Sequence, residues 1–274
     1  MKTWLVTGCS SGFGSVLASA VLARGDRLVA TARRPETLDP LVRLHPDTVR
    51  AVALDVTVPG QAAAAVRVAQ QAFGGLDVLV NNAGFGFVGA IEEGEPHEYR
   101  PMFEANVFGL VETTRAALPA LRERRGRVVN ISSVGGLVGR AGMGFYNATK
   151  FAVEGLSEAL AQEVEPLGLR VIIVEPGPFR TDFLGRSIGE AARRIPAYDA
   201  TAGAARAYRE GNDGRQSGDP TKAIAVLLKA VDADDPPLHL PLGQTAYDAA
   251  RAKLLALLAS MDRWEADATA TGFP

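Results

Sequence analysis

The sequence has few cysteines, few histidines and no long apolar run, and each shortage narrows what the protein can be. Its only cysteine, Cys9, cannot form a disulfide within the chain, which suits a reducing compartment. The 3 histidines, His45, His97 and His239, show no metal-ligand spacing, so we expect no metal site. No apolar stretch approaches the roughly 18 residues that span a bilayer, and residues 1–6 are too short for a signal peptide. We therefore expect a cytoplasmic protein without a membrane partner.

The chain also lacks an excess of charge of either sign. It carries 29 basic and 31 acidic residues, a net charge of −2, with 47% hydrophobic residues. This is ordinary globular composition, and 274 residues suit a single α/β domain. A short arginine run at 122–127 has no accompanying recognition motif and is typical of a solvated face. We expect no nucleic-acid partner.

Apolar segments of strand length alternate with amphipathic segments of helix length. The expected strands are 3–7, 27–32, 49–54, 78–80, 127–131 and 170–174, and the expected helices are 13–24, 61–73, about 101–124 and 145–165. Such alternation indicates repeated βαβ units, and uniformly apolar strands indicate a sheet covered on both faces. The sequence predicts a single-domain, doubly wound, Rossmann-like α/β fold. Its mostly parallel sheet has about seven strands with helices on both faces, and ligands bind at the carboxyl ends of the strands.

The regular pattern fails from 183 to 218, which we interpret as a substrate lid within the single domain 1–274. The paired acids Glu92 and Glu93 are expected at a solvated loop edge. Asp219 and Pro220 have the residue types of a helix start, so a helix should run to about Val231. A short strand near 238–240 and a last helix over about 245–261 complete the expected order.

A glycine-rich turn follows the first strand directly. Glycines at 8, 12 and 14 allow a sharp turn and close approach to a pyrophosphate, and the following helix start offers free N–H groups. The spacing differs from G-x-G-x-x-G, and such a turn alone can be a tight connection. We expect a dinucleotide site to which this turn contributes Gly8, Ser10, Ser11, Gly12, Phe13 and Gly14.

Two arginines, Arg33 and Arg34, end the second strand where an NAD site normally places an acid for the ribose 2′-hydroxyl. Guanidinium groups there can instead neutralise a 2′-phosphate. Arg33 is the better candidate, and the Ser11 hydroxyl is a second donor. The residues therefore favour NADP(H), while the alternative is that both arginines are solvated loop charges.

Small and polar residues follow the third and fourth strands. Asp55 and Val56 are placed to receive the adenine amino group and to flank its ring. Asn82, Ala83 and Gly84 follow the fourth strand, where the backbone must pass close to the ribose. An asparagine turn that only stabilises the strand end is compatible with this interpretation.

Four further residues have the types and positions needed for proton transfer. Tyr146 and Lys150 are four apart near the start of an expected helix, so both project from one face. A neighbouring ammonium and a nicotinamide cation should lower the pKa of the phenol. Ser133 ends a strand at the ligand edge of the sheet. Asn106 is a poor interior helix residue that can interrupt the backbone ladder, or a buried asparagine with satisfied hydrogen bonds.

Together these elements resemble the short-chain dehydrogenase/reductase family over nearly the whole chain. The matching elements are residues 7–14, Asp55, residues 82–84, Asn106, Ser133, Tyr146, Lys150, Pro176, Gly177 and Thr181. The resemblance implies that Tyr146 is the acid/base and that Lys150 lowers its pKa and binds ribose. It implies that Ser133 orients the substrate oxygen and that Asn106 supports a water relay.

The resemblance also implies a nicotinamide-carboxamide site at Pro176, Gly177 and Thr181. Many relatives carry valine or isoleucine two positions before the threonine, whereas this chain has Phe179, which can reshape that pocket. In similar proteins the helices here placed at 101–124 and 145–165 form a dimer face. This implies a homodimer or homotetramer.

The sequence thus predicts an NADP(H)-dependent oxidoreductase, a ketoreductase-like enzyme that interconverts a carbonyl and an alcohol. The substrate should be a hydrophobic small molecule, because most residues near the expected substrate side are apolar. These residues are Phe85, Phe87, Val134, Leu137, Val138, Met143, Phe179, Phe183 and Leu184. The alternatives are a catalytically silent NADP(H)-binding regulatory protein and an epimerase or dehydratase that retains its cofactor.

Overall fold

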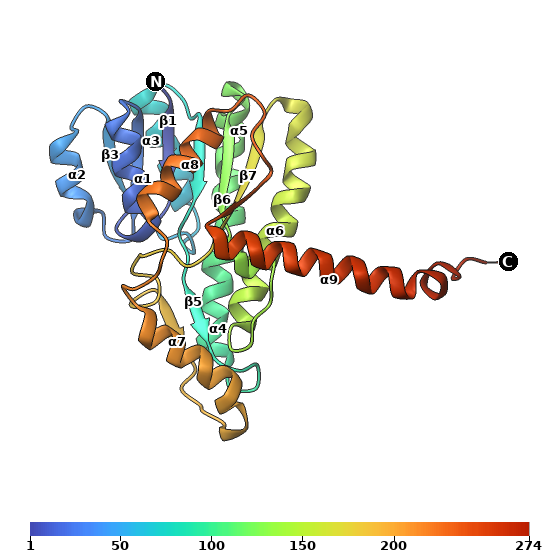
Figure 1. Ribbon diagram of the computed structural model, residues 1–274. Helices are drawn as coiled ribbons and strands as arrows, with labels where there is room; N and C mark the ends of the chain where they lie inside the picture. The colour runs from blue at the N-terminus through green and yellow to red at the C-terminus, as the bar shows by residue number, and fades with distance from the viewer. Residues whose placement is uncertain (274) are drawn as a thin grey trace.

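The computed structural model describes residues 1–273 and is built on a parallel sheet in the order β3-β2-β1-β4-β6-β7-β9 (Figure 1). The strands are β1 (Thr3–Val6), β2 (Arg27–Ala32), β3 (Val49–Ala53), β4 (Val78–Asn81), β6 (Arg127–Ile131), β7 (Arg170–Pro176) and β9 (His239–Leu242). The strand order reverses between β1 and β4, which opens a crevice at their carboxyl ends. The predicted doubly wound fold of about seven strands is confirmed.

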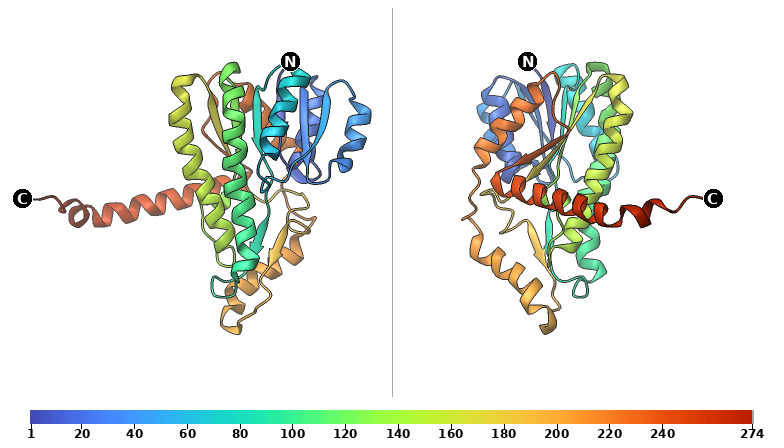
Figure 2. Two further views of the ribbon diagram at one scale, coloured as in Figure 1. Left: turned by 180° about the vertical axis from the view of Figure 1, so that it is seen from behind. Right: turned by 45° about the vertical axis from the view of Figure 1, so that its right-hand side comes forward.

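Helices cover both faces of this sheet, as Figures 1 and 2 show. One face carries α1 (Gly12–Ala23) and α8 (Pro220–Asp232), and the other carries α3 (Gln61–Phe73), α5 (Gly109–Arg124) and α6 (Gly144–Val164). In β1 the side chains alternate between the two cores, with Trp4 and Val6 in one and Leu5 in the other. Both faces are therefore apolar, which explains the uniformly apolar strands.

The helical segment after β4 begins earlier than expected and is interrupted where Asn106 stands. It consists of α4 (Pro96–Phe103), one π-helical turn at Glu104–Phe108, and α5. Glu95 and Glu98 form a capping box at its start. The expected break in the backbone ladder at Asn106 is confirmed. Two short elements, α2 (Asp39–Leu44) and β5 (Gly86–Val88), have no counterpart among the elements expected from the sequence.

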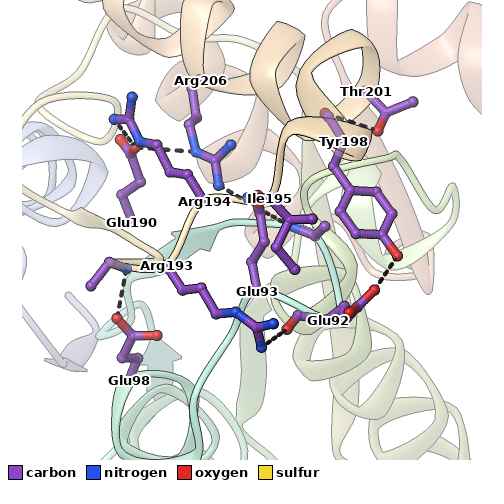
Figure 3. Close-up of polar contacts among 12 residues, drawn as sticks. Glu92, Glu93, Glu98, Glu190, Arg193, Arg194, Ile195, Tyr198, Thr201 and Arg206 are labelled. Carbon is purple, nitrogen blue, oxygen red and sulfur yellow. Dashed lines mark hydrogen bonds and ion pairs between the residues drawn. The ribbon is translucent and has the colours of Figure 1, made fainter.

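The segment 183–218 is more regular than its sequence indicated. It contains β8 (Ile188–Glu190), which pairs in parallel with β5, and α7 (Ala204–Asn212). Glu93 is fully buried in an ion pair with Arg206, so the expectation that it lies at a solvated edge was wrong (Figure 3). Its neighbour Glu92 is exposed, as expected, and accepts a hydrogen bond from the Tyr198 hydroxyl (2.7 Å).

The last three elements occur in the expected order. The Asp219 carboxylate accepts a hydrogen bond from the Thr221 N–H (2.8 Å) and caps α8. The final helix, α9 (Gln244–Thr269), is longer than expected and extends away from the body of the protein (Figure 1). Among residues 1–273, no helix combines the length and apolarity needed to cross a membrane.

Candidate active site

The glycine turn has the tight geometry that its residues predict. Gly8 and Gly12 have φ angles of +73° and +57°, in the left-handed region that favours glycine. A Cβ on Gly14 would lie 2.2 Å from the backbone oxygen of Gly8, so the start of α1 approaches the turn as only glycine permits. Burial raises the pKa of the Cys9 thiol to about 12, although a backbone hydrogen bond at Thr31 lowers it in part. That thiol is therefore no nucleophile.

The turn after β4 holds the glycine turn in place. The Asn82 amide donates to the backbone oxygens of Thr7 (2.9 Å) and Gly8 (3.0 Å). The Thr7 hydroxyl in return accepts from the backbone N–H groups of Asn82 and Ala83, both at 2.9 Å. A Cβ on Gly84 would lie 2.7 Å from Oδ1 of Asn106. The turn at residues 82–84, expected near the ribose, thus connects the glycine turn after β1 to Asn106 in the helical segment after β4.

Beyond β2 and β3, the expected adenosine side is more open. Arg33 and Arg34 are exposed. The Asp55 carboxylate accepts hydrogen bonds from the Thr57 hydroxyl (2.7 Å) and N–H (3.0 Å). These bonds lower the pKa of Asp55, burial opposes them, and Arg33 lowers it further. Val56 packs against Gly109 at the start of α5, where an added Cβ would lie 2.6 Å from Val56 Cγ2.

Ser133, Tyr146 and Lys150 come together where β6 ends and α6 begins. Tyr146 and Lys150 are both buried, and the Lys150 ammonium lies 5.8 Å from the centre of the Tyr146 ring. Lys150 Nζ donates to the backbone oxygen of Ile131 (2.8 Å). Ser133 Oγ accepts from the Gly135 N–H (3.0 Å) and lies close enough to the Tyr146 phenol to influence its pKa. The three side chains are thus held at the carboxyl edge of the sheet.

Burial dominates the electrostatics of this group. It raises the pKa of Tyr146 to about 12, although the neighbouring Ser133 hydroxyl lowers it in part. The expected lowering by the Lys150 ammonium is not found, because burial raises the pKa and it is Ser133 that opposes burial. Burial also lowers the pKa of Lys150 to about 8, although the nearby Glu154 raises it in part.

Asn106 is buried within the π-helical turn, and its amide is engaged on two sides. Its Oδ1 accepts from the Phe85 N–H (3.0 Å), and its Nδ2 donates to the Phe85 backbone oxygen (2.8 Å) and the Thr149 hydroxyl (3.1 Å). Asn106 therefore ties the loop after β4 to α6 between Tyr146 and Lys150. Both alternatives raised by the sequence hold, since it interrupts the helix and its hydrogen bonds are satisfied.

The family description "short chain dehydrogenase" matches residues 2–190. The chain belongs to the short-chain dehydrogenase/reductase family. "Oxidoreductase BOA17" of Botryotinia fuckeliana is 38% identical over 96% of each chain. The "3-ketodihydrosphingosine reductase" of Bacteroides thetaiotaomicron is 37% identical over 87% of each chain.

Solved structures agree with this assignment. A short-chain dehydrogenase from Streptomyces avermitilis is 45% identical over 99% of each chain, with a TM-score of 0.92. Two structures at 25% identity contain cofactor. The structure from Burkholderia phymatum holds NAD and has a TM-score of 0.80, with 91% of this chain and 92% of that chain covered. The structure from Burkholderia cenocepacia holds NADP and has a TM-score of 0.74, with 96% of each chain covered. This member of the short-chain dehydrogenase/reductase family is an oxidoreductase that uses a nicotinamide dinucleotide.

In this oxidoreductase the loop after β7 reaches the glycine turn. A Cβ on Gly12 would lie 3.8 Å from Thr181 Cβ, and Gly177 lies beside the first turn of α9. The Phe179 ring packs 5.3 Å from Phe13, centre to centre, and against Gly218. Pro176 ends β7 as a buried strand residue. Phe179 therefore supports the turn from behind, a role that its departure from the family pattern did not predict.

A hollow of about 300 Å³ lies between the glycine turn and this loop. Its lining includes three residues expected at the cofactor site, Ser10, Ser11 and Thr181. It also includes Arg180 and Arg186, which were not predicted from the sequence. Arg186 pairs with Asp182 (2.6 Å), and Arg180 donates to the Gln216 backbone oxygen (3.3 Å). The closeness of both arginines to Thr181 in the sequence could have indicated that they line the site. Isolated arginines in an irregular segment are, however, common on solvated surfaces.

Apolar side chains gather around Tyr146 on the expected substrate side. The Phe183 ring centre lies 5.6 Å from that of Tyr146, and Phe85, Phe87 and Met143 belong to the same cluster. Phe179 does not, because it packs against Phe13. The phenol therefore faces apolar surroundings supplied by the loop after β4, the start of α6 and the segment after β7.

A second group of titratable residues, outside this crevice, lies between α6, β7 and β9. His239 Nδ1 lies 2.8 Å from Glu175 and 3.6 Å from Glu154, although His239 showed no ligand spacing in the sequence. Burial raises the pKa of Glu175 to about 8 and that of Glu154 to about 7, and the Ser132 hydrogen bond lowers the latter in part. Two buried acids and one histidine thus lie in contact beside β7, outside the crevice.

Proposed function

We propose that this protein is an NADP(H)-dependent oxidoreductase that interconverts a carbonyl and an alcohol on an apolar small molecule. The observation that carries the proposal is the Ser133–Tyr146 hydroxyl pair at the edge of the crevice, with apolar side chains around it. A neutral hydroxyl pair can donate hydrogen bonds to one carbonyl oxygen. The apolar surroundings favour a substrate without charge.

The backbone geometry of the crevice fits a bound dinucleotide. The glycine turn leaves no room for a Cβ at Gly14 and opens onto the N-terminus of α1, which attracts a pyrophosphate. Ser10, Ser11 and Thr181 would line the phosphates and nicotinamide, and Arg33 would meet the 2′-phosphate. The bound cofactor supplies or accepts the hydride, and the side chains of the protein manage the proton.

For reduction, Ser133 and Tyr146 donate hydrogen bonds to the carbonyl oxygen, and Tyr146 gives up its proton as the alcohol forms. A phenol with a raised pKa stays protonated at neutral pH, which suits this direction. Lys150 would hold the ribose hydroxyls of the bound cofactor, and its ammonium, 5.8 Å from the centre of the Tyr146 ring, would place a positive charge near the phenolate left behind. Positioned acid catalysis of this kind typically contributes about 10²–10⁴-fold, and orientation and electrostatics supply the rest.

The substrate class rests on the apolar cluster and on one relative. The similar Bacteroides protein is named "3-ketodihydrosphingosine reductase", a name that specifies a ketone substrate. Phe85, Phe87, Met143 and Phe183 would contact the apolar substituents of a ketone. We therefore expect ketones, aldehydes or secondary alcohols with apolar substituents to react, and sugars or charged acids to react poorly.

The proposal predicts that Tyr146→Phe abolishes turnover and leaves NADPH binding intact, because only the titrating hydroxyl is removed. NADPH oxidation with a carbonyl panel measures the rate, and a fluorescence titration measures binding. Tyr208→Phe, on the exposed face of α7, is the matched control and should keep parental activity.

The same assay separates the alternatives. Retention of a tenth of the parental rate in Tyr146→Phe would contradict the proton transfer. NADPH binding without oxidation by any carbonyl would favour the silent binding protein. Substrate conversion without net change in NADPH would favour an epimerase or dehydratase.

A further inference from the structure

The outer part of α9 carries apolar side chains that nothing in the described chain covers. Only its first turns are buried, at Ala246 and Ala250, and no side chain from 251 to 269 is buried. Leu257 is 49% exposed, Met261 59% and Trp264 63%. In every view of Figures 1 and 2, α9 extends away from the body of the protein. Most helical stability in proteins comes from packing of an apolar face, so the uncovered apolar side chains of α9 point to a packing partner.

Most of the exposed apolar residues follow the spacing of a coiled coil, with Leu255 and Leu258 beside the stripe. Alternating steps of three and four residues join Leu254, Leu257, Met261, Trp264 and Ala268, and the same register runs back through Ala250, which is buried against the body, to Tyr247. These are the a and d positions of successive heptads, beginning with Tyr247 at a, which bring one stripe of a helix against a neighbouring helix. The stripe thus fits another helix better than a flat surface.

The charges of α9 distinguish a protein partner from a membrane surface. Its helix carries three basic residues and four acidic residues, namely Arg251, Lys253, Arg263, Asp248, Asp262, Glu265 and Asp267. Helices that lie on membranes are instead rich in lysine and arginine on their polar face. The slightly acidic balance here therefore favours a helix of mixed charge as the partner.

We propose that α9 pairs in antiparallel orientation with α9 of a second copy of this chain. In that arrangement each a residue meets a d residue, so Leu254 packs against the partner's Trp264 and Leu257 against the partner's Met261. The flanking positions then place Arg251 beside the partner's Glu265 and Lys253 beside the partner's Asp267. Two-fold symmetry repeats both ion pairs, so four opposite-charge pairs flank one apolar seam.

A parallel pairing loses this charge complementarity. It would place Lys253 beside the partner's Leu258 and Ser260 beside the partner's Glu265, with no ion pair at either place. The antiparallel arrangement also closes on itself through a two-fold axis, so it forms a finite assembly and not a filament. The pairing is independent of any contact through α5 and α6.

The first test changes the seam in the full-length chain. Leu257→Glu puts two carboxylates into one apolar seam and should weaken the association through α9 at least about 100-fold. Ala259→Glu, on the opposite face of the helix, is the matched control and should associate as the parent does. Sedimentation velocity from about 1 to 100 μM measures the change, with circular dichroism to verify folding.

The expected result is loss of one association step, from dimer to monomer, or from tetramer to dimer if the body also associates. A Leu257→Glu variant with the association state of the parent would overturn the proposal, as would a monomeric parent at about 100 μM. Parent protein that remains monomeric and sediments with vesicles of phosphatidylcholine and phosphatidylglycerol would assign the stripe to a membrane surface instead.

The second test addresses the orientation. Arg251→Glu should weaken the association about tenfold, because it places a carboxylate beside the partner's Glu265 in both symmetric pairs. Adding Glu265→Arg to the same chain should restore the parental affinity, since each glutamate again meets an arginine. Failure of the double variant to recover would overturn the antiparallel arrangement even if Leu257→Glu dissociates the protein.

Discussion

The two sides of the active-site crevice are held together by different forces. On the cofactor side, Asn82 and Thr7 join the two turns through neutral hydrogen bonds with backbone groups. On the substrate side, the segment after β7 is anchored by buried charges, chiefly Arg206 with Glu93 and Glu190 (Figure 3). A neutral network tolerates the loss of one bond, whereas a buried ion pair that loses one partner leaves a charge without compensation.

The largest expected effect comes from breaking that ion pair. Glu93→Ala leaves the Arg206 guanidinium buried without its main partner and removes the acceptor of the Ala90 and Ile195 N–H groups. We expect a loss of about 3–5 kcal/mol in the free energy of unfolding of this segment. Limited proteolysis within residues 190–212 and chemical denaturation measure it.

Glu92→Ala is the matched control, because Glu92 is the exposed neighbour and its carboxylate, among residues 1–273, accepts a hydrogen bond from the Tyr198 hydroxyl alone. It should cost at most about 1 kcal/mol. Equal proteolysis of the two variants would show that the buried pair does not anchor the segment. The affinity for NADPH should change little in both, because the cofactor side does not depend on these charges.

A smaller effect concerns Glu175 and Glu154, whose pKa values burial raises to about 8 and about 7. An acid with a raised pKa binds more protons in the folded state, so the free energy of unfolding falls as pH rises from about 5 to about 9. We expect Glu175→Gln to flatten this dependence and to stabilise the protein at pH 9 by about 2 kcal/mol. The figure is below the full shift because Glu154, which interacts with Glu175, also takes up protons in this range.

Thermal or urea unfolding across this pH range measures the slope. Glu158→Gln is the control, because Glu158 also lies near His239 (3.6 Å) but is half exposed. It should leave the slope unchanged. A parental stability that rises between pH 6 and pH 9 would show that Glu175 is ionised throughout.

The same contrast explains which parts of the protein could be predicted from the sequence. The glycine turn and the break at Asn106 could be predicted because each depends on the conformations that nearby residues allow the backbone to adopt. The Glu93–Arg206 pair was not, because its partners are 113 residues apart. His239 joins its acids only through the pairing of β9 with β7.

The side-chain roles divide in the same way. Ser133, Tyr146 and Lys150 were predicted from spacing along one strand and one helix, and the structure brings them together. The role of Phe179 beside the nicotinamide stays a prediction, whereas the packing of its ring against Phe13 and Gly218 was not predicted. Aromatic packing between distant loops has no local signature.

The smallest expected effect tests the cofactor side itself, at Arg33. A 2′-phosphate carries close to two negative charges, and a guanidinium can meet it with two charge-assisted hydrogen bonds. At an exposed residue such as Arg33 this should give NADPH at least about a tenfold advantage over NADH, roughly 1.4 kcal/mol. Arg33→Ala should erase most of the preference, and Arg34→Ala should change it less. Because the attraction is between charges, added salt should reduce the NADPH advantage of the parent and leave NADH binding nearly unchanged. Titrations of both cofactors at two salt concentrations measure this, and equal parental affinities would make both arginines ordinary surface charges.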